Sequence, residues 1–119
     1  MSRGPVSQKA IDFAMPSAYA RGFVMFCRRG RGSVATFVIH AAAYTAVVAV
    51  VRSRRLHGTL AEMELQCAET IGRLRLVPAG LCRSLELWAC SDHGGIRFFR
   101  VMPKGIIELG RDGEPIVSA

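Results

Sequence analysis

An uncharged stretch of eighteen residues, Val34 to Val51, constrains this chain more than any other feature of its sequence. It reads VATFVIHAAAYTAVVAVV, and arginines flank it on both sides. An α-helix rises about 1.5 Å per residue, so a helix of this length would span about 27 Å, close to the hydrocarbon thickness of a bilayer. The stretch therefore predicts a transmembrane helix, which we place at residues 33–57.

Two other interpretations of the stretch compete with this one: a helix buried in a globular fold, and a pair of valine-rich strands. A chain of 119 residues leaves too little protein to surround a helix that is apolar on all sides. The many alanines in the stretch favour helix over strand. The membrane interpretation is therefore preferred.

The stretch is only weakly apolar for a membrane helix, because it contains no leucine and its valines are interrupted by polar residues. Its helical spacing predicts two packing interfaces. The first is a row of small side chains that would let a neighbouring helix approach closely: Ala35, Ala42, Ala46 and Ala49. The second is a polar stripe that would face protein rather than lipid: Thr36, His40 and Tyr44. Because the stretch offers no second ligand, His40 is expected to bond a neighbouring helix rather than act as a proton relay or haem ligand.

The flanking arginines are expected to contact lipid headgroups or partner proteins. They are Arg28, Arg29, Arg31, Arg52, Arg54 and Arg55. With three arginines on each side, the positive-inside rule finds no asymmetry, so the sequence does not predict the orientation in the membrane.

The N-terminal arm, residues 1–32, is basic and resembles a mitochondrial transit peptide in composition. Four aromatic residues alternate with its arginines: Phe13, Tyr19, Phe23 and Phe26. This mixture is typical of a segment that lies at a membrane surface or against a partner. Nucleic-acid binding is the other interpretation of basic and aromatic residues together, and is less favoured beside a membrane span.

The residues after the stretch predict a helix and then strands. Thr59 and Glu62 form a capping box, which begins an amphipathic helix at 58–77. From there the periodicity changes, and residues 78–119 predict a small antiparallel β region with short strands near 84–90, 96–102, 106–109 and 115–117. Glycine-rich loops between these strands indicate hairpins.

The sequence contains no motif that predicts catalysis or metal binding. Its four cysteines include no CxxC pair, and the spacing of Cys82, Cys90 and His93 matches no zinc site. The tripeptide Ser91-Asp92-His93 is contiguous, whereas a catalytic triad needs residues that converge in space. We therefore expect no enzyme activity, no catalytic residues, no metal and no cofactor.

Together these features predict a single-pass membrane α-helix followed by a small α+β element, an amphipathic helix with a short antiparallel β-meander. The expected function is that of a non-catalytic accessory subunit of a multi-subunit inner-membrane complex, specifically a mitochondrial respiratory-chain complex or ATP synthase. The expected partners are other membrane-protein subunits and lipids, without a small-molecule substrate or nucleic acid. Two alternatives stay open: a small bacterial inner-membrane protein that self-associates, and a basic RNA-binding subunit of a ribosome-like particle.

Overall fold

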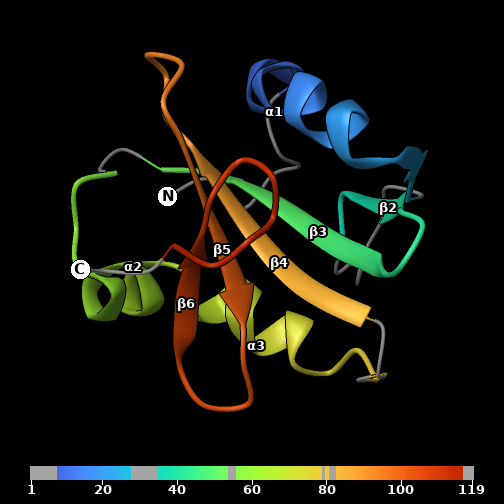
Figure 1. The fold of residues 1–119 in the computed structure, drawn as a ribbon. Coiled ribbons are helices and arrows are strands. Elements are labelled where there is room, and N and C mark those ends of the chain that lie inside the picture. The colour runs from blue at the N-terminus through green and yellow to red at the C-terminus, as the bar shows by residue number, and fades with distance from the viewer. Residues whose placement is uncertain (1–7, 28–34, 54–55, 79, 81–82, 117–119) are drawn as a thin grey trace.

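The computed structural model describes residues 8–27, 35–53, 56–78, 80 and 83–116. In chain order these residues form α1 (Gln8–Arg21), β1 (Phe23–Phe26), β2 (Phe37–His40), β3 (Thr45–Arg52), α2 (Leu60–Gln66), α3 (Ala68–Leu74), β4 (Arg83–Cys90), β5 (Ile96–Val101) and β6 (Ile106–Leu109). All these strands belong to one sheet, in which their spatial order follows the chain from β1 to β6. Helix α1 covers one face of the sheet, and α2 and α3 cover the other (Figure 1).

Neighbouring strands are antiparallel except for β3 and β4, which run parallel at the centre of the sheet. Parallel neighbours need a crossover connection, and α2 and α3 lie in that connection. The central strands are therefore covered by helices on both faces. In β3, Ala46 and Val48 face α1, whereas Val47 and Ala49 face α2 and α3.

The predicted transmembrane helix at 33–57 is wrong, because the uncharged stretch folds as β2 and β3. A tight turn joins the two strands, and in it the Ala41 N–H donates to the Tyr44 carbonyl at 3.0 Å. A strand buried on both faces is a continuous run of apolar residues rather than an alternating one, which is why the stretch resembles a membrane segment.

No helix in the described part of the chain is long and apolar enough to cross a membrane. This finding also overturns the predicted single-pass architecture and the location in a mitochondrial or bacterial inner membrane. The β-meander is not a separate element either, because β4 pairs with β3 and makes β4, β5 and β6 half of one mixed sheet.

Local signals in the second half of the chain are confirmed. Thr59 Oγ1 accepts from the Glu62 N–H at 3.1 Å, and the Glu62 carboxylate accepts from the Thr59 N–H at 2.8 Å, so the capping box is present. The helix expected at 58–77 is divided into α2 and α3 at Cys67. Strands β4, β5 and β6 occupy the first three expected strand regions, whereas in the fourth region, described as far as residue 116, Pro115 makes an isolated bridge to Leu109.

The arm predicted at residues 1–32 contributes α1 and β1 to the fold. Three small residues of α1, Ala10, Ala14 and Ala18, are buried against the sheet. They let the helix lie close to an aromatic core in which the Trp88 ring contacts Phe37 and Phe98 edge-on, with centroids 5.4 and 4.8 Å away.

Candidate functional site

A buried ion pair joins the end of α1 to β4. Arg21 donates through both Nη atoms to the two carboxylate oxygens of Glu86, at 2.7 and 2.8 Å. The side chains are only 4% and 0% exposed. Arg21 Nε also donates to the Tyr44 hydroxyl at 2.9 Å, while Ser84 Oγ and Trp88 Nε1 donate to Glu86 at 2.9 and 3.0 Å.

The two charges of this cluster neutralise each other. Burial alone would lower the pKa of Arg21, but the hydrogen bonds and charge of Glu86, together with the Tyr44 hydroxyl, raise that pKa above its ordinary value. Arg21 therefore stays charged. Among the described residues every buried side-chain nitrogen and oxygen has a hydrogen-bond partner, so the cluster holds no buried polar atom in reserve for a ligand. We interpret the pair as a structural link between α1 and the sheet.

Two shallow depressions of about 500 and 480 Å³ lie beside the ion pair. Both contain Tyr44 and Asp112, and their other charged residues are arginines and Glu114. Positive and negative side chains line both depressions, so neither presents a single sign of charge to a ligand. Neither depression therefore indicates a particular substrate.

A different kind of site lies at the edge of the sheet formed by β1. The opposite edge, at β6, is partly covered by the chain itself, because the Ile116 N–H donates to the Glu108 carbonyl at 3.0 Å. Within the described residues no strand pairs with the outer side of β1. Strand β1 reads FVMF and contains none of the charges or prolines that usually protect an edge from other chains.

The backbone of β1 offers unpaired hydrogen-bonding groups at this edge. The Cys27 N–H donates to the Thr36 carbonyl of the chain leading into β2, at 3.0 Å. Because alternate residues of an antiparallel strand bond to the same neighbour, Met25 and Phe23 also bond toward β2. Val24 and Phe26 consequently direct their N–H and C=O groups outward.

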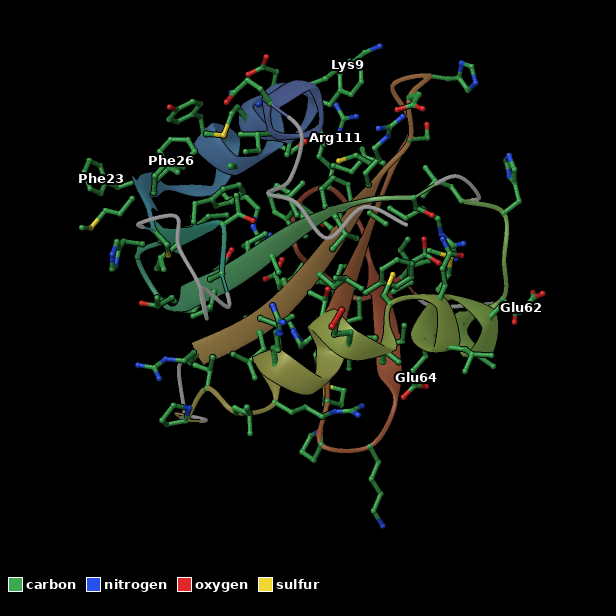
Figure 2. The ribbon with its side chains drawn as sticks, turned by 180° about the vertical axis from the view of Figure 1, so that it is seen from behind. Lys9, Phe23, Phe26, Glu62, Glu64 and Arg111 are labelled. Carbon is green, nitrogen blue, oxygen red and sulfur yellow. The ribbon has the colours of Figure 1, made fainter. Side chains whose placement is uncertain are left out.

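Large apolar side chains surround this edge. We call them the β1 patch: Tyr19, Phe23, Met25 and Phe26, which are 62%, 68%, 52% and 55% exposed. Figure 2 shows Phe23 and Phe26 projecting at the same edge of the molecule. An exposed cluster of this kind is a typical feature of an interaction surface.

The β1 patch extends over both faces of the sheet. Phe26 contacts Phe37 on the α1 side, with ring centroids 5.9 Å apart. Side chains alternate along a strand, so Phe23 and Met25 point to the other face. There α2 packs mainly on β6 and α3 on β4, and the side chains of β1 are left exposed. The fold thus leaves both sides of this edge apolar and uncovered.

The predicted helix-packing faces do not form, because these residues lie in strands and loops rather than in a helix. Within the alanine row, Ala46 and Ala49 are buried on opposite faces of the sheet, Ala42 is exposed in the turn between β2 and β3, and Ala35 lies beside the α2–α3 core.

The predicted polar stripe is also separated by the fold. Thr36 Oγ1 accepts from the Val50 N–H at 3.0 Å, and Tyr44 bonds to Arg21. His40 is exposed next to Phe23, with ring centroids 6.4 Å apart. These three residues therefore have three unrelated local roles.

Only one of the six flanking arginines lies in the described part of the chain. Arg52 pairs with Asp92 at 2.6 Å, and both side chains are about half exposed. The other five lie outside the described residues: Arg28, Arg29, Arg31, Arg54 and Arg55.

The described residues contain no group of three metal-ligating side chains. Cys82 lies outside them. Cys90 is buried, donates to the Ala10 carbonyl at 3.6 Å, and has its thiol pKa raised to about 11 by that burial. A thiol in this state is a packing group rather than a nucleophile.

Three residues of the β1 patch, Tyr19, Phe23 and Phe26, are among the aromatic residues that the sequence predicts in a segment against a membrane or partner. Met25 and the open strand edge have no such signal in the sequence, because both depend on β1 being the first strand of a sheet. No protein-family model matches the sequence, no curated protein matches it, and no solved structure matches the fold.

Proposed function

We propose that this chain is a non-catalytic assembly module that binds protein through the β1 patch and the open edge of β1. The observation that carries the proposal is the contrast between the two edges of one sheet. The β6 edge is partly covered by the chain itself, whereas the outer side of β1 has no paired strand within the described residues, and this strand is uncharged and bordered by exposed aromatic side chains.

Physical reasons connect such an edge to protein binding. Unpaired N–H and C=O groups at a sheet edge are a template for an added strand, and side chains on alternate faces of that strand then supply specificity. Aromatic residues and methionine are also enriched at protein interfaces, and lysine and glutamate are depleted. The β1 patch has this composition.

The charge distribution favours a protein partner over a nucleic acid. The described residues carry ten lysines and arginines against nine aspartates and glutamates. Five of the arginines form ion pairs with carboxylates: Arg21, Arg52, Arg73, Arg75 and Arg97. Nucleic-acid binding needs an unneutralised basic surface, and this near balance of charge in the described residues does not favour the RNA-binding alternative.

Photo-crosslinking in the cell that produces the chain tests the proposal. We replace Phe23 with a benzophenone amino acid, and place the same group at Leu65 of α2 as a control. Leu65 is 79% exposed and lies on a helix that packs mainly at the opposite edge of the sheet. Protein adducts are expected from position 23 and not from position 65, and Met25→Lys should abolish them.

Either of two results would contradict the proposed function. One is the absence of protein adducts at position 23. The other is an equal yield of adducts at positions 23 and 65, which would indicate random collision rather than a binding edge.

A further inference from the structure

We infer that the strand that pairs with β1 is the β1 strand of a second copy of this chain. The two strands run antiparallel across a two-fold axis at Met25, and the two sheets become one continuous sheet. This inference rests on the proposed function, because it names the partner of the same edge. Three features of the edge carry it: the spacing of its outward groups, the position of Tyr19 and the absence of charge.

The outward backbone groups match those of a second copy. Val24 and Phe26 lie one on each side of Met25, so a two-fold axis at Met25 places Val24 of each copy opposite Phe26 of the other. Each of these pairs exchanges two N–H···O=C hydrogen bonds. All the outward groups of Val24 and Phe26 are then satisfied in both copies. A two-fold axis that passed between two residues would pair neighbouring residues of the strand, whose side chains point to opposite faces. Directly paired residues in a sheet must have their side chains on the same face, so this register is not allowed.

The distribution of exposed apolar side chains favours a second copy over an isolated extended peptide. A peptide strand would cover β1, but Tyr19 lies outside the strand, on α1, and is 62% exposed. A second copy adds its own α1 on the same face of the joined sheet as the first, because a two-fold axis perpendicular to the sheet does not exchange the two faces. Tyr19 then lies on the face to which the partner also contributes a helix, while on the other face Met25 meets its equivalent and Phe23 lies opposite Cys27 of the second copy.

The charges of the described residues do not oppose this contact. The whole chain has a formal net charge of +7, so two copies repel each other at long range. The β1 patch contains no charged residue, and the guanidinium of the neighbouring Arg21 is buried against Glu86. Two copies can therefore meet at this edge without placing unneutralised charges of the patch together.

The available area suits a reversible dimer. With roughly 200 Å² of surface for each of the four patch residues, three aromatic residues and Met25, their exposed parts amount to about 470 Å² per copy. Two copies would bury about 940 Å² from these side chains alone, and the backbone of β1 adds to this. The total is close to the lower limit of about 1,000 Å² for specific interfaces, and we expect a dissociation constant in the micromolar range.

Sedimentation velocity of the purified chain, at concentrations from about 1 to 100 µM, tests the inference. The wild type should change from the 13.0 kDa monomer to a species of twice that mass. Met25→Lys and Met25→Glu should each weaken dimerisation at least about tenfold, because two like charges then face each other across the axis. An equimolar mixture of the two variants should form a dimer again, because opposite charges then face each other.

Leu65→Lys is the matched control, since it adds the same charge at an exposed apolar residue far from β1 and should leave dimerisation unchanged. Met25 is 52% exposed, and circular dichroism checks that each variant keeps the fold. Three results would overturn the inference: a wild type that stays monomeric throughout, a Met25→Lys dimer of unchanged strength, or a variant mixture that stays monomeric.

The two experiments separate this inference from the proposed function. A monomeric chain whose position 23 crosslinks to a different protein overturns the second-copy inference and leaves the proposed function standing. A monomeric chain without adducts overturns both. Adducts of the chain with itself at position 23, together with the restored mixed dimer, support both.

Discussion

Glu86 is the residue on which the polar interior depends most, because its carboxylate neutralises the guanidinium of Arg21, whose side chain is only 4% exposed. Glu86→Gln removes the charge and leaves Arg21 buried without a counter-ion. We expect a loss of about 3–5 kcal/mol in the free energy of unfolding, measured by urea denaturation with circular dichroism. The double variant Arg21→Met/Glu86→Leu should lose less than Glu86→Gln, because it leaves no isolated charge. A free energy of unfolding for Glu86→Gln within about 1 kcal/mol of the wild-type value would contradict the role given to this pair.

Cys90 makes stability depend on pH in the alkaline range. Its thiol is buried, which raises its folded-state pKa to about 11, whereas an unfolded cysteine titrates near about 8.5. The neutral thiol's contribution to the free energy of unfolding is therefore fully present below about pH 8.5. Up to about 3 kcal/mol of this free energy is lost as the pH rises toward 11. Urea denaturation between pH 8 and 11 measures the decline, and Cys90→Ala should show a shallower one. If the free energy of unfolding declined equally steeply with pH in the wild type and in Cys90→Ala, groups other than Cys90 would cause the decline.

At the scale of single residues, the sequence revealed only those site residues that have a local signal. The aromatic residues Tyr19, Phe23 and Phe26 stand out because they interrupt a basic arm. Arg21 and Glu86 are 65 positions apart, and nothing in either local sequence indicates that they meet. Such a pair becomes visible only when the topology places the end of α1 over β4.

At the scale of elements, β2 and β3 show why the membrane prediction failed. The turn between them is made of alanines and Tyr44, and it lacks the glycine, proline, asparagine or aspartate that usually marks a turn. Two strands and their turn therefore read as one uncharged run. Because β3 is also buried on both faces, the alternation that distinguishes strand from helix is missing.

Elements with local chemical signals were predictable. The capping box at Thr59 specified the start of α2, and glycine-containing loops specified the turns that flank β5. Gly94 and Gly105 adopt φ of +85° and +77° there, in the left-handed region that glycine enters without strain. The order of the strands was not predictable in the same way, because the parallel pairing of β3 with β4 depends on contacts between residues far apart in the chain.

The capping box supplies a test at the scale of the element. Thr59→Ala removes the side-chain acceptor of the Glu62 N–H and should cost about 1 kcal/mol in the free energy of unfolding. Thr59→Ser keeps an acceptor at the same place and should stay close to wild type. Urea denaturation compares the two variants. Equal losses in both would indicate that the threonine methyl group, and not the cap, stabilises this end of α2.

At the scale of the whole molecule, one sheet separates two hydrophobic cores. The core on the α1 side contains Trp88, and the core on the other side contains Met63 and Ile71. Consecutive residues of β4 enter opposite cores, as Leu87 and Trp88 do. Loosening of either core therefore displaces the strand that supports the other, and the two cores are expected to unfold together.

Ile71→Ala tests this coupling, because Ile71 of α3 is 1% exposed and lies in the core that does not contain Trp88. The cavity should cost about 2–5 kcal/mol. Trp88 is the only tryptophan of the chain, so its fluorescence reports on the α1-side core, while circular dichroism reports on the whole fold. In Ile71→Ala, the denaturation midpoints measured by fluorescence and by circular dichroism should shift by the same amount. Gly72→Ala, at an exposed neighbouring position with open space around it, should instead stabilise the fold by about 0.5–1 kcal/mol. Separate midpoints for the two probes in Ile71→Ala would show that the cores unfold independently, despite sharing β4.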